Sequence, residues 1–507
     1  MRFLKNISHM FHRVELSRLR RCRCMYRTVS LLLIWLIASN ACKAGPLTKL
    51  LELALNGEPT YQGAKSNLQA SEARSKQALG ALLPQVNLSV NTNNNNRGYA
   101  TRNINSPTEK DAYNSNSGQL NITQGIWRYA NIVSVQQADA VLEQTQHQLM
   151  GTEQELFTKL VVSWFDVLAA RDNIEFTKQQ VMATRKQWDV NLRGVEFGTS
   201  GMPQAQEAKA KYDQALSDAI SAETDSHIKI ATLEQLVGTS PYLELPYLRN
   251  DVYDDVRDGI VWVDLKADRL EKWLAAVETS NPNILAAQKA FEAADAEIRK
   301  QKAGHHPTLD LVGTYSNNSQ AVGGFPGQNG YDIRQRSIGL QLNIPLFSGG
   351  TQSAKVSEAV AMREKARADI EAARRTALLT AKQGWFGWQA AHAKIQAGIQ
   401  EVAAAKIALK VAYTGSENGL KSELDVLQAE QQFYAGLRDL RKGYYDQIAS
   451  YVKLKAAAGR LTQEDIESID RLFVTSPLKE IPIEPERIVP TPESNKLLLK
   501  ASLSLSK

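Results

Sequence analysis

The 507-residue chain has only three cysteines, and all of them lie near its amino terminus, at Cys22, Cys24 and Cys42. Without the first 44 residues the chain has no thiol, so it can form neither a disulfide nor a cysteine metal site. After residue 44 the chain also lacks any run approaching the roughly 20 apolar residues of a membrane-spanning helix. If the chain enters a membrane, it therefore does so as strands.

Motifs of catalysis and metal binding are missing as well. The sequence has no HExxH, GxSxG or GxxxxGKS pattern. His305 and His306 precede a strand pattern, but no third ligand stands at metal-site spacing, which favours an ordinary histidine pair. We therefore expect no enzyme activity, no cofactor and no metal site.

An excess of basic charge is present only at the amino terminus. The chain has 60 Lys and Arg against 54 Asp and Glu, but nine of the basic residues and one acid fall within residues 1–44. The remainder has 51 basic and 53 acidic residues, a net charge of −2. This balance removes the main argument for nucleic-acid binding.

The basic segment is typical of an export signal. It leads into an apolar run from Val29 to Ala38, too short to span a membrane, and then into small residues ending at Ala44. We predict a signal peptide over 1–44 that is cleaved after Ala44. Two alternatives stay open, namely a lipid-modified Cys42 and a translation start at Met25.

The sequence repeats itself. Pro59 and Pro84 recur 223 positions later, and Trp164-Phe165 recurs 221 positions later as Trp385-Phe386. We predict a first repeat over 45–238, a linker over 239–281, a second repeat over 282–460 and a C-terminal extension over 461–507. The proline-rich end of this extension, 475–507, is expected to be disordered.

Each repeat begins with a helix pattern, 46–82 or 282–303, and continues with two strand patterns. Leu340 and Leu342, for example, alternate with Gln341 and Asn343. Such period-two strands fit a transmembrane barrel with a wet interior or a half-buried soluble sheet, and periodicity does not separate them. Polar loops are predicted over 97–117 and 319–335.

The longest patterns are helical. Residues at alternating steps of three and four, most of them apolar, predict a helix over 128–195, about 100 Å long, and a matching helix in the second repeat. Charged members of these seams indicate that the interface is not a dry core throughout. Glycine-containing turns follow, and helices return over 204–238 and 423–458. The predicted seams are Phe157, Leu160, Trp164, Val167, Arg171, Ile174, Lys178, Val181, Arg185, Trp188 and Leu192, and Leu378, Ala381, Trp385, Trp388, His392, Ile395, Ile399, Val402, Lys406, Leu409 and Tyr413.

The order of these elements resembles the TolC-type outer-membrane factors. Two segments carry the resemblance most clearly, GLQLNIPLFSGG over 339–350 and GLKSELDVLQA over 419–429. The resemblance implies a mixed α+β membrane protein, a homotrimer in which each chain gives four strands to one twelve-stranded barrel. The helices would continue this barrel as a coiled-coil tunnel through the periplasm. Four strands alone leave open edges, which lipid does not tolerate, so association would close them.

The resemblance also implies a function and partners. It predicts an outer-membrane channel for efflux or type I protein secretion, working with a periplasmic adaptor and an inner-membrane pump or ABC transporter. The alternative is an exported periplasmic coiled-coil scaffold without a pore, which would have no need of four strands. A passive duct carries no sequence signal for its substrate, whether drug or secreted protein.

The closed end of the tunnel would lie at the hairpin tips, 194–203 and 415–425. The family commonly has two aspartates there, matched here by Asp425 and Gln428, so one acidic ring is retained; Glu423 is the second candidate for it. As an alternative, Asp425 is an ordinary charge in the first turn of a helix. The resemblance implies latch contacts from Lys421, from Gln204 after Pro203, and from Tyr413. Gln204 replaces an acid of the family, so we expect a weaker latch.

Overall fold

A computed structural model describes residues 45–99, 109–238, 246–248, 269–322 and 329–474. The predicted signal peptide with Cys42 and Met25, most of the linker, and the tail 475–507 lie outside the described residues. The helices are α2 Pro46–Gly57, α3 Pro59–Gly80, α4 Tyr129–Glu196, α5 Met202–Val237, α7 Leu270–Ser280, α8 Pro282–Ala303, α9 Thr351–Glu417, α10 Glu423–Ala457 and α11 Gln463–Asp470. The strands are β1 Gln85–Tyr99, β2 Glu109–Trp127, β3 Tyr247–Leu248, β4 Thr308–Gln320, β5 Tyr331–Asn343 and β6 Phe473–Val474.

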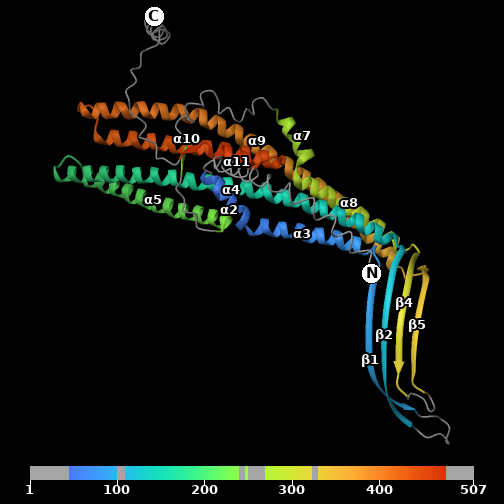
Figure 1. Cartoon of the computed structure of the whole chain (residues 1–507). Helices are drawn as coiled ribbons and strands as arrows, with labels where there is room; N and C mark the ends of the chain where they lie inside the picture. The colour runs from blue at the N-terminus through green and yellow to red at the C-terminus, as the bar shows by residue number, and fades with distance from the viewer. Residues whose placement is uncertain (1–44, 100–108, 239–245, 249–268, 323–328, 475–507) are drawn as a thin grey trace, which may run out of the picture.

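The molecule is long, with a sheet at one end and two helical hairpins at the other (Figure 1). The order of two helices, two strands and a long helical hairpin occurs twice, first as α2 to α5 and again as α7 to α10. Residues 46–82 were predicted as one helix, but two helices form. Glu58 is extended, because a residue before proline is disfavoured in the helical region, and Pro59 begins α3.

The sheet has the strand order β1-β2-β4-β5, and every neighbouring pair is antiparallel. Residues directly opposite one another share a face. Val86, Ile122, Gly313 and Ile338 lie in one row across all four strands, and the adjacent row is the polar set Asn87, Asn121, Thr314 and Ser337. The alternation seen in each strand therefore becomes one apolar and one polar face of the whole sheet.

The strands are longer than predicted. β1 continues to Tyr99 and β2 begins at Glu109, so strand pairing takes up much of the polar segment 97–117 that was predicted as a loop. β5 likewise begins at Tyr331, inside the predicted loop 319–335. Asn and Ser are poor strand formers, but cross-strand bonds such as Thr92 to Asn116 support them here.

The main core lies where the two repeats meet. Trp164 on α4 and Tyr444 on α10 are fully buried there, together with Leu47 from α2 and Ile466 from α11. A second cluster surrounds Trp385 and Trp388 on α9. No helix in the described ranges is long and apolar enough to cross a membrane.

The helical hairpins pack through small residues. One row of α9 places a buried glycine or alanine at every seventh position: Ala377, Gly384, Ala391, Gly398, Ala405 and Ala412. A Cβ atom on Gly384 would lie 2.9 Å from the backbone nitrogen of Leu454, so α10 approaches the backbone of α9 directly.

This packing corrects part of the predicted seam. Ala381, Trp388, Ile395 and Leu409 are buried as predicted, and so are Phe157, Trp164 and Trp385 in the other predicted row. The charged members of that row are only partly buried or exposed, namely Arg171, Lys178, Arg185 and Lys406. In each case the residue one position earlier is buried instead: Ala170, Thr177, Thr184 and Ala405. One residue turns the helix by about 100°, so the charged side chains flank the interface.

Candidate functional site

The hairpin tips lie at the end of the molecule opposite the sheet (Figure 1). The first tip joins α4 to α5 and the second joins α9 to α10. Each contains a glycine in the left-handed region, Gly198 with φ 74° and Gly419 with φ 71°, which ends the long helix and reverses the chain. The predicted gate segments 194–203 and 415–425 are therefore both turns, and the two turns project from the same end.

Asp425 caps the second returning helix. Its carboxylate accepts bonds from the Ser422 backbone N–H and hydroxyl, both at 2.8 Å, and its own N–H donates to the Ser422 hydroxyl at 3.2 Å. These bonds hold the pKa of Asp425 below its usual range, with the Ser422 backbone N–H as the main cause. This reciprocal cap is the alternative role predicted from the sequence, that of a charge in the first turn of a helix. Within one chain, capping is sufficient to account for an aspartate at this position.

Glu423 makes a different contact. It forms an ion pair with Lys186 of α4, and the two side chains are 55% and 48% exposed. Glu423 belongs to the second hairpin and Lys186 to the first, about 15 Å before the end of α4. This contact, which we call the tip tie, joins the two hairpins near their ends. Sequence reasoning missed it because Lys186 is one of many exposed charges on a long helix.

The predicted latch residues make bonds within their own hairpins. The side chain of Gln204 accepts from the Gly201 N–H, and Pro203 occupies the first turn of the same helix. Lys421 packs against Gly415 across its turn. Tyr413 donates to Glu430, and this bond raises the pKa of Tyr413 to about 12. Gln428 is exposed on α10.

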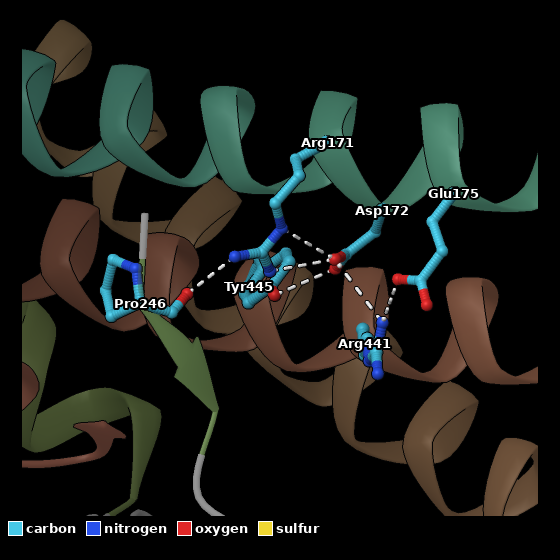
Figure 2. Close-up of polar contacts among 6 residues, drawn as sticks. All are labelled: Arg171, Asp172, Glu175, Pro246, Arg441 and Tyr445. Atoms are coloured by element: carbon cyan, nitrogen blue, oxygen red, sulfur yellow. Dashed lines mark hydrogen bonds and ion pairs between the residues drawn. The ribbon is translucent and has the colours of Figure 1, made fainter. Parts of the chain in front are cut away.

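A buried polar cluster lies farther from the tips, between α4 and α10 (Figure 2). Asp172 is only 3% exposed and accepts from Tyr445 at 2.9 Å and from Arg441 at 3.4 Å. Arg441 also donates to Glu175 at 3.3 Å. Arg171 donates to Asp172 at 2.8 Å and to the backbone oxygen of Pro246 at 2.7 Å.

These six residues, which we call the central cluster, join both repeats and the segment before β3. The sequence signal was weak, because Arg171 was assigned to the predicted seam and Asp172 beside it was not singled out. A buried carboxylate that has lost its partners is strongly unfavourable, so the cluster fixes α4 against α10.

The structure supplies no metal centre within the described ranges: no group of three or more His, Cys, Asp or Glu side chains is placed to hold an ion. The histidine pair lies at the end of α8. The His306 ring packs against Tyr129, with 5.6 Å between ring centroids.

Two long helical hairpins that continue a four-stranded antiparallel sheet are the fold of solved outer-membrane channels. The chain belongs to the outer membrane efflux protein family, whose model matches residues 50–239 and 273–460. The predicted family, outer-membrane location and role as an efflux or secretion duct are thereby confirmed, and the family's members are channels rather than enzymes.

Relatives match over most of their length. The outer membrane protein TolC of Vibrio cholerae is 26% identical over 85% of this chain and 94% of its own. The proteases secretion protein PrtF of Dickeya chrysanthemi is 25% identical over 89% of this chain and 96% of its own. The solved Campylobacter jejuni CmeC outer membrane channel superposes with a TM-score of 0.66 at 14% identity, covering 84% of this chain and 90% of that one. The last likeness concerns the fold alone.

Proposed function

We propose that three copies of this chain form one twelve-stranded barrel in the outer membrane, through which the duct opens to the outside. The observation that carries the proposal is the sheet, which has one apolar face and two edge strands, β1 and β5. The outer edge of each pairs with no other strand among the described residues. Its apolar face is open to solvent in the single chain, with Ile338 79% exposed. Lipid would cover this face, and neighbouring chains would pair the edges.

In this assembly the helical hairpins continue the barrel as a tunnel through the periplasm. The 68 residues of α4 span about 100 Å as a continuous helix. Side chains on one side of the hairpins would face water inside the tunnel. The charged rows that flank the small-residue interface suit a wall of helices with water beside it.

The duct works with two further components, a periplasmic adaptor and an inner-membrane pump or ABC transporter. Among its relatives, two have names that refer to protease secretion and one to a solvent efflux pump. The alternative of an exported scaffold without a pore has no support among these relatives.

The gate of the duct lies at the hairpin tips. Three copies of Asp425 around one axis would form a negative constriction that favours cations, while Gln428 in place of a second acid leaves a single charged ring. The tip tie between Lys186 and Glu423 would hold the two hairpins of each chain together in the closed state. Lys421, Gln204, Pro203 and Tyr413 would shape the individual tips.

Single-channel recording tests this proposal. The purified protein should migrate as a heat-resistant trimer and should conduct ions across a planar bilayer with a preference for cations. Asp425→Ala should reduce that preference and the block by trivalent cations without lowering trimer yield. Absence of both trimer and conductance would overturn the duct. Unchanged cation preference in the variant would instead show that Asp425 does not line the constriction.

A further inference from the structure

The end of the C-terminal helix α11 packs against the start of the first helix α2. Asp470, the last residue of α11, is 7% exposed. Its carboxylate accepts from the Leu47 N–H at 3.2 Å, the Thr48 N–H at 3.0 Å and the Thr48 hydroxyl at 2.8 Å. A side chain more than 400 positions away thus closes the amino-terminal end of α2.

Gly45, just before α2, lies directly against this carboxylate. A Cβ atom on Gly45 would be 2.0 Å from Oδ2 and 2.6 Å from Oδ1 of Asp470, so no other residue fits without a shift. The backbone nitrogen of Gly45 is bonded to the same Cα atom. From covalent geometry it lies within about 4.5 Å of Oδ2.

Asp470 is a buried carboxylate that has no cationic partner in the part of the chain that the structure describes. Within the described residues no Lys, Arg or His forms an ion pair with it. Three donors occupy three of the roughly four acceptor positions of a carboxylate. The partial positive charge at the start of α2 compensates only part of a full negative charge. One acceptor position of Asp470 and about half of a counter-charge are therefore left to be supplied.

We infer that the missing cation is the new amino terminus of the mature chain. Cleavage after Ala44, as the sequence predicts, would convert the amide nitrogen of Gly45 into an ammonium group beside Asp470. The ion pair forms only in the processed chain and joins its first residue to the C-terminal segment. Removal of the leader thus completes the clamp between α2 and α11. This inference rests on the predicted cleavage position and is independent of the trimer and the gate.

Two variants of the mature protein test the inference. An alanine inserted between Ala44 and Gly45 moves the ammonium by one residue, about 3.5 Å, and leaves Asp470 intact. Asp470→Asn keeps the shape and the acceptor oxygen but removes the charge. Glu464→Gln, at an exposed position of the same helix, is the matched control. N-terminal sequencing of each protein comes first.

Two readouts are then compared. Each variant should lower the midpoint of thermal unfolding, followed by circular dichroism at 222 nm, by several degrees. The double variant should lose no more than Asp470→Asn alone, because the insertion removes only the ion pair that Asp470→Asn has already removed. An acylating reagent near neutral pH should modify the wild-type terminus at least about tenfold more slowly than the terminus of either variant, because pairing keeps the amine protonated.

Three results would overturn the inference. A mature terminus other than Gly45, such as a lipidated Cys42, removes the ammonium from the site. Equal reactivity of the wild-type and extended termini means that no ion pair forms. Additive losses in the double variant mean that Asp470 acts as a helix cap alone. If Asp470→Asn fails to accumulate, the extended chain with Asp470 intact still decides the question.

Discussion

Two of the polar contacts that join α4 to α10 differ sharply in their surroundings. The central cluster around Asp172 is buried and shares its bonds among both repeats, whereas the tip tie between Lys186 and Glu423 is a single, half-exposed ion pair. On α4 the two contacts lie 14 residues apart, about 21 Å along the helix. Breaking a buried pair costs several kcal/mol, while an exposed pair contributes about 0–1 kcal/mol. The hairpins are therefore held firmly near the middle of the molecule and weakly near their ends.

The largest expected effect is at the central cluster. Asp172→Ala should lower the free energy of unfolding by about 3–5 kcal/mol, because Arg441 and Arg171 then lose their common acceptor. Urea unfolding followed by circular dichroism measures this loss. Asp225→Ala, at an exposed position on α5, should change stability by less than about 0.5 kcal/mol. A similar small loss for both variants would show that the cluster does not fix the two repeats.

In the proposed assembly the sheet is the second region where a substitution should strongly affect stability. Leu342→Arg places a charge on the apolar face near the end of β5 and should lower the yield of assembled trimer after extraction. Gln341→Arg, one position earlier on the polar face, should leave trimer yield unchanged and alter conductance. Equal tolerance of the two changes would argue for a soluble sheet.

At the tip tie we expect a small effect on stability and a large one on gating. Glu423→Gln should change the free energy of unfolding by less than about 1 kcal/mol, because the pair is half-exposed. It should raise the fraction of time that single channels spend open in planar bilayers.

Lys186→Met should act in the same way as Glu423→Gln, and the double variant should equal either single one. Glu207→Gln is the control, because Glu207 and Lys211 form an ion pair of similar exposure within α5. If the Glu423 and Lys186 variants open as often as the wild type, the tip tie does not stabilise the closed state.

The smallest effect concerns Tyr413, whose bond to Glu430 stays within the second hairpin. Its pKa is raised to about 12, above the ordinary value of about 10, so its stabilising contribution is complete below pH 10 and is lost as the pH rises toward 12. Alkaline titration at 295 nm should show one tyrosinate appearing near pH 12 that Tyr413→Phe lacks. If the wild type lacks this late component, the tyrosine is not bonded to Glu430.

The sequence predicted the long helices well, because their periodicity extends over many turns and few breakers interrupt it. It misassigned the charged positions of each interface for a physical reason. The spacing of three and four, set by the large apolar residues, also included Arg171, Lys178 and Lys406 in the seam. Burial favours the glycine, alanine and threonine row beside them, since small side chains let two helices approach closely.

The contacts between hairpins were less predictable. Lys186 and Glu423 are 237 positions apart, and nothing in either local sequence distinguishes them from other exposed charges. Asp172 and Arg441 meet only because α4 and α10 pack side by side. The glycine-containing turns located the ends of the hairpins, but the bonds at Gln204 and Tyr413 depend on neighbours that only the three-dimensional structure specifies.

The unpaired edges of the sheet have a consequence for cells that carry two forms of the gene. In the proposed trimer, β1 of each chain would meet β5 of the next, so every chain takes part in two of the three junctions. A variant chain that folds but has one defective edge strand would prevent closure of the barrel in any trimer that contains it. With equal amounts of both forms and random mixing, only about one ring in eight would contain three intact chains. Edge mutations should therefore be dominant, whereas variants that fail to fold should be recessive.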